Sequence, residues 1–387
     1  MNILFCTTYR VSEQKGGTER ITARIAQALR EKGHRCFSAY KAEIAEGLPL
    51  AKWDGELNAT NQSLEDYILN HHIDVIIIQK MTREVKQIYL IRERHYLQLK
   101  IISALHFAPA YEEIEVSFHH AWDMLKTKCN LKNGLRFLLF PIYKVWYPQR
   151  NKALYRTVYK YSDKVVLLSK RFVQEYMNYA GITNNEKFTA IPNALSYDEF
   201  LPIEKLKNKK KQALVVSRLV ETPKRISYAI KAWAEIEKDS ELQEWNLKIV
   251  GSGPAEDSYK ELTLKLGIKR IDFGGRQQPK PYYEESSLLL MTSSYEGWGL
   301  TLTEAQQFGC VPIAFDSYSS IHDIITNGEN GFLIENNNIQ LLTEKLKLLM
   351  KDKKMLNNMA KDAISSSHRF ELYKIIYHWL KLIETNK

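Results

Sequence analysis

Residues 288–315 read LLLMTSSYEGWGLTLTEAQQFGCVPIAF, and this stretch decides the fold predicted for the chain. The apolar run 288–291 has the length of a buried parallel strand, Gly297 and Gly299 interrupt it, and 301–308 has the length of a short helix. A second apolar strand follows at 311–315. In open α/β sheets such strand-to-helix loops lie at the carboxyl edge, where free N–H groups at the helix start attract anions. The stretch therefore predicts an α/β fold with a phosphate-binding loop.

Two glutamates, Glu296 and Glu304, flank this loop. On one continuous helix they would point about 80° apart at ~100° per residue, but the two glycines place Glu296 before the helix and Glu304 in its first turn. Both carboxylates can then converge on one small ligand. A capping box from Thr301 to Glu304, with Glu296 as a solvated loop acid, explains the same residues. Residue chemistry alone leaves both interpretations open.

Length and composition indicate a globular protein of two or three domains. The chain has 387 residues, 44% hydrophobic and 26% charged, and it lacks the ~20 uninterrupted apolar residues of a membrane span. The first residues, MNILFCTTYR, predict a strand rather than a signal peptide. The cysteines are far apart in the sequence, which predicts free thiols in a cytosolic protein: Cys6, Cys36, Cys129 and Cys310.

Strand and helix patterns alternate along two successive halves of the chain, which predicts two lobes with a cleft between them. We expect an N-terminal domain at 1–193, a polar linker at 194–211 and a C-terminal domain at 212–369. A last helix within 370–387 has apolar spacing, and we expect it to pack back on the first domain.

The first half offers two candidate site features at strand ends. Gly16 and Gly17 follow the first predicted strand, where paired glycines let the backbone approach a phosphate or a sugar. His106 ends the predicted strand 100–106, in a position to face a cleft. A flexible turn and a hydrogen-bonded structural histidine are the alternatives.

A basic segment at 124–160 carries nine of the ten net positive charges and no acidic residue: Lys126, Lys128, Lys132, Arg136, Lys144, Arg150, Lys152, Arg156 and Lys160. Aromatic residues are interspersed with these cations. The pattern predicts an element lying on an anionic membrane, where each basic residue can add about 1 kcal/mol. A solvated helix face and a single-stranded nucleic-acid surface are the alternatives, and we expect no nucleic-acid partner.

Several short motifs together resemble the retaining GT-B glycosyltransferases of family 4. They occur in the family's order over nearly the whole chain: GGTER at 16–20, HFAP at 106–109, IPN at 191–193, SRL at 217–219, VGSGP at 250–254, FGGR at 273–276, EGWGLTLTEAQQFGCVPIA at 296–314 and NGENGFLI at 327–334. The resemblance implies a GT-B fold, that is, two Rossmann-like domains with an interdomain cleft. It also implies a nucleotide-diphosphate sugar donor, of the UDP or GDP type, bound mainly by the second domain.

The resemblance implies roles for particular residues. Glu304 would hold the ribose hydroxyls, and Glu296 would hold hydroxyls of the donor sugar and act in catalysis. The diphosphate would meet the backbone of Gly299, Leu300 and Thr301 and the side chains of Arg218 and Lys224. His106 would lie beside the reacting centre, and Gly16 and Gly17 would shape the site from the other domain.

The sequence departs from the family at the phosphate lysine. Pro223 occupies the usual lysine position, so we assign the role to Lys224 across a one-residue insertion, with Arg225 as the fallback. No Asp-x-Asp motif occurs in the chain. We therefore expect no metal and no other cofactor, with the cations neutralising the diphosphate instead.

The predicted function is transfer of a hexose to a hydroxyl of a saccharide or glycolipid acceptor, with retention of anomeric configuration. The basic segment suggests bacterial surface polysaccharide or lipopolysaccharide assembly at the inner face of the plasma membrane. A GT-B epimerase and a non-catalytic membrane-docking scaffold remain alternatives. A dehydrogenase is disfavoured, because Glu256 ends GSGPAE where a dinucleotide site needs Gly or Ala.

Overall fold

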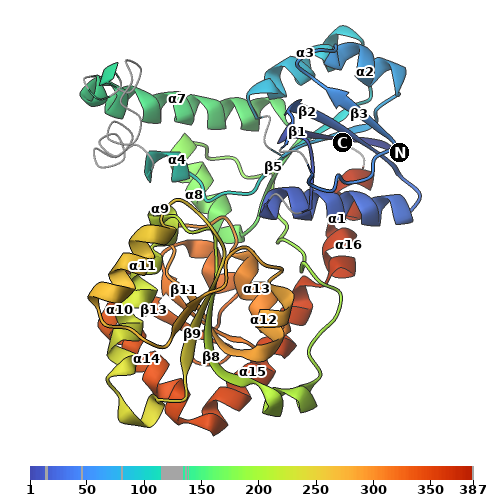
Figure 1. Cartoon of the computed structure of the whole chain (residues 1–387). Helices are drawn as coiled ribbons and strands as arrows, with labels where there is room; N and C mark the ends of the chain where they lie inside the picture. Colours follow the sequence, from blue (N-terminus) through green and yellow to red (C-terminus); the bar gives the residue numbers. More distant parts are fainter. Residues whose placement is uncertain are drawn as a thin grey trace. The chain divides into compact units, whose positions relative to one another are not determined.

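The computed structural model describes residues 1–13, 16–44, 47–79, 82–114, 134, 135, 137 and 139–385. The chain divides into two compact units (Figure 1). Unit 1 contains Met1–Pro192 and Ile375–Lys387, and unit 2 contains Asn193–Lys374. Each unit is built on one parallel sheet with helices, as in a Rossmann-like domain.

Unit 1 has a seven-stranded sheet in the order β3-β2-β1-β4-β5-β6-β7, with every neighbouring pair parallel. Its strands are β1 (Asn2–Tyr9), β2 (Arg35–Ala42), β3 (Gly55–Asn58), β4 (Val75–Ile78), β5 (Lys100–Leu105), β6 (Lys164–Leu167) and β7 (Phe188–Ala190). All four side chains of β4, VIII, are buried, as expected of a central parallel strand. The edge strand β3 was not predicted, because GELN has no apolar alternation.

Helices of unit 1 follow the strands along the chain. They are α1 (Gly17–Glu31), α2 (Leu64–Asn70), α3 (Val85–Arg94), α4 (Tyr111–Ile114), α7 (Phe140–Tyr161), α8 (Lys170–Ala180) and most of α16 (Leu372–Glu384), with η1 (Thr82–Glu84) before α3. The apolar face predicted for the first helix is buried in α1, including Ile21, Ile25 and Leu29.

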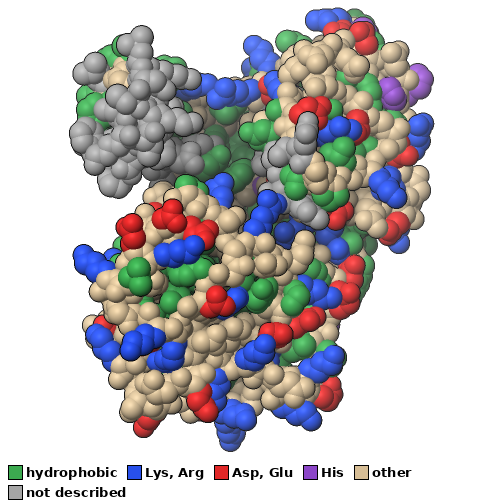
Figure 2. Space-filling model, viewed as in Figure 1, with side chains coloured by type: hydrophobic (Ala, Val, Ile, Leu, Met, Phe, Trp, Pro, Cys, Tyr) green, Lys and Arg blue, Asp and Glu red, His purple; other side chains and the backbone are tan. Residues whose placement is uncertain are grey.

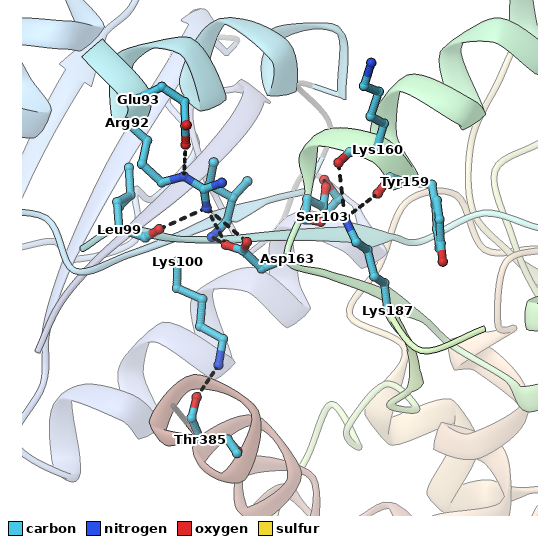
Figure 3. A network of polar contacts seen from close by, with 12 residues as sticks. Arg92, Glu93, Leu99, Lys100, Ser103, Tyr159, Lys160, Asp163, Lys187 and Thr385 are labelled. Carbon is cyan, nitrogen blue, oxygen red and sulfur yellow. Dashed lines mark hydrogen bonds and ion pairs between the residues drawn. The ribbon is translucent and has the colours of Figure 1, made fainter. Parts of the chain in front are cut away.

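Two lysines, Lys100 and Lys187, donate hydrogen bonds to backbone carbonyls at the C-terminal ends of α16 and α7 (Figure 3). Lys100 of β5 is buried, and its Nζ donates to the carbonyl of Thr385 at 2.7 Å and to that of Leu382. Lys187 Nζ donates to the carbonyls of Tyr159 and Ser162, 3.2 and 2.9 Å away. The last carbonyls of a helix lack intrahelical donors, so an ammonium group there satisfies them and complements the helix dipole. These contacts hold the ends of α16 and α7 against the sheet of their own unit.

Unit 2 has a six-stranded parallel sheet in the order β10-β9-β8-β11-β12-β13. Its strands are β8 (Lys210–Val216), β9 (Asn246–Val250), β10 (Ile271–Phe273), β11 (Ser286–Met291), β12 (Val311–Asp316) and β13 (Phe332–Glu335). Its helices are α9 (Glu221–Lys224), α10 (Ile226–Glu237), α11 (Glu256–Lys265), α12 (Lys280–Glu285), α13 (Leu300–Gln307), α14 (Ile339–Lys351) and α15 (Lys353–Ser367), with 3-10 turns η2 (Ile203–Asn208), η3 (Ser240–Leu242), η4 (Ser319–Asp323) and η5 (His368–Phe370).

The segment 194–211 is attached to unit 2. It contains η2 and the first residues of β8. Gln307 of α13 donates its Nε2 to the carbonyls of Tyr197 and Glu199, at 2.8 and 2.7 Å. These bonds hold the start of the segment on the helix that carries Glu304.

The described residues show mixed charge on the visible face of unit 2 and three buried, free cysteines. On the visible face of unit 2, acidic and basic side chains are interspersed (Figure 2). Cys6, Cys36 and Cys310 are free and buried, and burial raises the pKa of each thiol to about 12; Cys129 lies outside the described residues. No helix in the described ranges is both long and apolar enough to cross a bilayer.

Candidate active site

Two loops meet at the carboxyl edge of the sheet in unit 2. They follow β8 and β11, which are parallel neighbours, so both loops leave the same edge. The amide of Ser294 donates to the carbonyl of Pro223 at 2.8 Å, and Thr292 Oγ1 donates to the carbonyl of Arg225 at 2.9 Å. Ligands of open α/β sheets bind at this edge. The bonds fix the two loops that carry most of the predicted donor residues.

Lys224 and Glu296, both predicted site residues, form an ion pair between these loops. Glu296 Oε1 accepts from Lys224 Nζ and also from Ser293 Oγ at 2.7 Å. Both side chains are partly exposed, at 23% for Lys224 and 16% for Glu296, so a ligand can reach them. Ser293 was not predicted, because a serine in a polar loop carries no distinctive pattern.

Arg225, the fallback for the phosphate contact, is held by protein acceptors. Its backbone is left-handed, with φ at 49°. Its guanidinium donates to two backbone carbonyls and two side-chain amides, those of Thr292, Ser293, Asn336 and Asn337. Most of its five N–H donors are therefore engaged within unit 2. This geometry favours Lys224 over Arg225 as the cation available to a ligand.

The start of α13 is shaped by Gly299. This residue precedes the helix with φ at 86°, a conformation that glycine adopts without the cost a Cβ brings. A Cβ here would lie 2.6 Å from the hydroxyl of Tyr318. Burial, with the charges of Glu296 and Asp316, raises the pKa of Tyr318 above its usual range, so this hydroxyl stays protonated. The glycine leaves the helix N-terminus accessible from the loop.

The N-terminus of α13 offers backbone donors. Among the described residues no side chain caps this helix. The first N–H groups of a helix lack intrahelical acceptors, and here they belong to Leu300 and Thr301. With the positive end of the helix dipole, they form a site for an anionic group. The predicted diphosphate contact has suitable donors here.

Glu304 is buried, with 1% of its surface exposed, and its two oxygens face two protein hydroxyls. Oε1 accepts from Ser196 Oγ at 2.5 Å, and Oε2 accepts from Tyr283 OH at 2.8 Å. These contacts are unlike a capping box, in which the carboxylate would bond the backbone at the helix start. Neither hydroxyl was predicted, because Ser196 lies in the predicted linker and Tyr283 in a short helix without a recognisable motif.

Arg218 lies two residues beyond β8 and is exposed. Its guanidinium has no hydrogen-bond or ion-pair partner in the part of the chain that the structure describes. The loop around it is packed closely on the VGSGP motif: a Cβ on Gly251 would lie 1.8 Å from the carbonyl oxygen of Ser217. The amide of Leu219 also donates to the carbonyl of Ser252 at 3.0 Å. Glycine at 251 permits this approach, which fixes the backbone that carries Arg218.

The remaining predicted site residues belong to unit 1. His106 directly follows β5 and is buried, and Gly16 precedes α1, which begins at Gly17. Strands β1, β4 and β5 are neighbours, so these residues share the carboxyl edge of their sheet. Gln79, just after β4, accepts from Thr22 Oγ1 at 2.6 Å and is a buried polar residue that the sequence analysis missed.

No group of three or more His, Cys, Asp or Glu side chains that could hold a metal ion occurs within the described ranges. The site in unit 2 instead combines two carboxylates, two available cations and a helix N-terminus. Carboxylates accept from sugar hydroxyls, and cations with backbone N–H groups bind phosphate. The arrangement is therefore suited to a ligand that carries both a sugar and a phosphate.

The residues of unit 2 match a known family. The model for "Glycosyl transferases group 1" matches residues 196–366. Over 376 residues, the chain is 30% identical to an uncharacterised glycosyltransferase of Haemophilus influenzae, covering 94% of this chain and 95% of that protein. It is 25% identical over 242 residues to a Campylobacter jejuni N-acetyl-D-galactosaminyltransferase named for a PP-undecaprenol-linked saccharide, covering 62% of this chain and 64% of that one.

A similar solved structure is that of Anabaena HepE in complex with UDP. The TM-score is 0.73 at 18% identity, and the match covers 99% of both chains. This likeness establishes the fold, and the Haemophilus influenzae relative extends the family assignment over nearly the whole chain. The chain therefore belongs to the glycosyl transferases group 1 family and is a glycosyltransferase with two Rossmann-like domains of the GT-B fold.

Proposed function

We propose that the enzyme transfers a hexose from a nucleotide-diphosphate sugar to a hydroxyl of a saccharide or glycolipid acceptor, with retention at the anomeric carbon. The observation that carries this proposal is the ion pair between Lys224 and Glu296 beside the free N-terminus of α13. It brings the carboxylate that we propose for the sugar hydroxyls and the cation that we propose for the phosphate together in one pair of loops.

On binding of the donor, Lys224 and Glu296 would exchange their mutual contact for contacts with the donor. Its diphosphate would meet the N–H groups of Leu300 and Thr301 with Lys224 and Arg218, which neutralise the charge that grows on the leaving group. Glu296 would accept from the sugar hydroxyls, and Glu304 from the ribose hydroxyls. The nucleotide is of the UDP or GDP type, and the UDP complex of the structural relative HepE supports the choice of donor class.

In the proposed chemistry the acceptor oxygen bonds to the anomeric carbon on the face from which the phosphate leaves. The bond between that carbon and the phosphate oxygen breaks, and the acceptor's proton passes to the departing phosphate. Retention follows without an enzymic nucleophile. His106 would lie beside the reacting centre, and Gly16 and Gly17 would shape the acceptor side. Because the sequence has no Asp-x-Asp motif, the fixed cations would serve in place of a metal.

The acceptor is proposed to be a lipid-linked saccharide of bacterial surface polysaccharide or lipopolysaccharide assembly. Support comes from the Campylobacter jejuni relative, whose name specifies a PP-undecaprenol-linked saccharide. The enzyme would then work at the cytoplasmic face of the plasma membrane, in peripheral contact with it. The contact predicted over 124–160 rests partly on Lys126, Lys128, Lys132 and Arg136, which lie outside the described residues.

A thermal-shift screen against UDP-, GDP- and ADP-sugars tests the donor class, because a ligand that binds the folded state raises the melting temperature. We expect one nucleotide class to give the largest shift, and Glu304→Gln to reduce it. No shift with any donor would overturn the proposal.

A turnover assay with the preferred donor then tests the reaction. Nucleoside diphosphate release that depends on an added acceptor, and continues in EDTA, would support metal-independent transfer. Conversion of the donor into an isomer without acceptor would instead identify an epimerase. Activity that EDTA abolishes and Mg²⁺ or Mn²⁺ alone restores would contradict the metal-independent chemistry.

A further inference from the structure

The N-terminal half of α7 exposes a row of apolar side chains. Leu139, which immediately precedes the helix, is 47% exposed; Ile142 is 67%, Val145 70% and Trp146 51% exposed. The amide of Tyr143 donates to the carbonyl of Leu139 at 2.9 Å, so the helical geometry includes that residue. At ~100° per residue the four side chains fall within an arc of about 120°. They form one continuous apolar stripe, here called the α7 stripe.

The C-terminal half of α7 buries the opposite side. Its buried residues, Asn151, Tyr155 and Val158, centre about 170° from the α7 stripe at ~100° per residue. The stripe therefore faces away from the body of unit 1. In Figure 1 the helix extends beyond the sheet of its own unit.

Contacts with α8 and the sheet hold the C-terminal half in place. The rings of Tyr155 and Tyr176 lie 4.6 Å apart, and Tyr176 OH donates to the carbonyl of Tyr155 at 2.7 Å. Arg156 Nε donates to the carbonyl of Ala180 at 2.6 Å. Lys187 closes the last turn. Tyr155 is one of the aromatic residues interspersed with the cations of the basic segment, but it is buried, with 4% of its surface exposed.

Cations continue the outward face where the α7 stripe ends. The helix carries five basic residues and no acidic one: Lys144, Arg150, Lys152, Arg156 and Lys160. Arg150 and Lys160 are exposed and lie within about 30° of the stripe's arc at ~100° per residue. The guanidinium of Arg150 lies 5.2 Å from the ring centroid of Trp146. One face of α7 thus changes from apolar to basic along its length.

We propose that this face of α7 docks on the surface of an anionic phospholipid bilayer. The α7 stripe enters the boundary between headgroups and acyl chains, at a depth of about 5–10 Å, and Trp146 lies at the headgroup level. The basic residues remain at the surface, where each adds about fivefold to partitioning. Three of the four stripe residues are aliphatic, which suits acyl chains rather than nucleobases, since bases stack on aromatic rings.

Vesicle binding by the full chain tests this inference without donor or acceptor, so its result is separate from that of the proposed reaction. We expect co-sedimentation with vesicles of phosphatidylcholine and phosphatidylglycerol, little with phosphatidylcholine alone, and weaker binding as salt rises. The double variant Ile142→Asp with Val145→Asp should bind at least tenfold more weakly. Leu264→Asp, at a residue of α11 that is 80% exposed, is the matched control and should bind like the wild type.

Two further measurements keep the test independent of folding. Arg150→Glu changes charge at an exposed position and should lower binding about tenfold or more, with the melting temperature unchanged. Trp146→Phe should remove a blue shift of tryptophan fluorescence that anionic vesicles produce in the wild type. Equal binding to neutral and anionic vesicles would overturn the proposal. Binding as tight as that of the wild type by both the Ile142→Asp, Val145→Asp double variant and Arg150→Glu would also overturn it. Tighter binding to a single-stranded oligonucleotide, lost in the same variants, would also overturn it.

Discussion

In unit 2, Lys224, Glu296 and Glu304, here called the cluster, have protein partners for their charged groups, whereas the outward face of α7 in unit 1 exposes apolar and basic side chains. In the cluster, Glu296 is paired with Lys224, and both oxygens of Glu304 accept from protein hydroxyls. On α7, cations lie beside exposed apolar side chains with no acid in the helix. A cluster whose charged groups are paired has its geometry fixed before a ligand arrives, whereas exposed apolar side chains are covered only when another surface binds. We therefore expect substitutions in the cluster to lower catalytic activity, and substitutions on the outward face of α7 to weaken binding to anionic membranes.

The largest effect should come from Glu296. Replacing it by Gln keeps the side-chain size but removes the charge that accepts from sugar hydroxyls. We expect turnover with the preferred donor to fall ~10²-fold or more, the scale seen when a positioned catalytic group is lost. The exposed Glu235 of α10 provides a control, because Glu235→Gln should leave turnover unchanged. A loss of less than threefold in Glu296→Gln would show that the pair only supports the loops.

Glu304 should rank second, because its effect is on donor binding. In Glu304→Gln one oxygen becomes an amide that faces a hydroxyl, and the remaining acceptor capacity is reduced. We expect the KM for the donor to rise ~10-fold, since a hydrogen bond to a charged group contributes about 1.5–3 kcal/mol. Tyr283→Phe removes only one of the two hydroxyls that donate to Glu304, so it should raise the KM for the donor less. Unchanged donor affinity in Glu304→Gln, measured by calorimetry with the free nucleotide, would assign this carboxylate a purely structural role.

Lys224 and Arg225 are neighbours whose substitutions should separate activity from stability. Lys224→Ala should lower kcat/KM ~10-fold with a small change in melting temperature, because the lysine is partly exposed. Arg225→Ala should lower the free energy of unfolding by about 1–3 kcal/mol, because buried acceptors lose their donor. Steady-state kinetics measure the loss of activity in the two variants, and chemical denaturation measures their loss of stability. The reverse pattern would assign the phosphate contact to Arg225.

Lys209 should give the smallest effect, one on stability alone. Its Nζ donates to the carbonyls of Tyr283 and Ser286, and burial lowers the pKa of this ammonium to about 8. Between pH 8 and about 10.5 the unfolded chain binds more protons than the folded one, so the free energy of unfolding should rise with pH. We expect a rise of about 1–3 kcal/mol that Lys209→Met abolishes. Lys207→Met, at an exposed lysine of η2, is the control, and an equal rise in both variants would contradict the assignment.

The loop before α13 was predictable from local sequence, whereas the two hydroxyls that contact Glu304 were not. Gly299 breaks the apolar run and starts a helix within one residue of the predicted position, because the glycine requirement is local. Ser196 reaches Glu304 from more than a hundred residues away. No periodicity reports such a long-range contact, and the polar surroundings of Ser196 resembled a linker.

In the basic segment, too, a tertiary contact decided the outcome and could not be predicted from the sequence. Its composition predicted an element lying on an anionic membrane, but aromatic residues and cations recur along all of α7, so composition does not show which part of the helix is covered. The division comes from Tyr176 and the neighbouring part of α8, which bury Tyr155 and leave Trp146 exposed. Which face of a helix is covered depends on the element that packs on it, and here that element is α8, which lies outside the basic segment whose composition was interpreted.

Strand β5 has its own consequence for engineering the chain. It begins at Lys100, whose ammonium is bonded to the carbonyls of Leu382 and Thr385, and it ends immediately before His106. Deleting residues from 382 onward would remove two carbonyl acceptors from the buried Lys100 ammonium, at the end of β5 opposite His106. A buried charge that loses hydrogen-bond acceptors is costly, so trimming the C-terminal helix should destabilise the core of unit 1. Affinity tags and fusions at this end should leave the last turn of α16 intact.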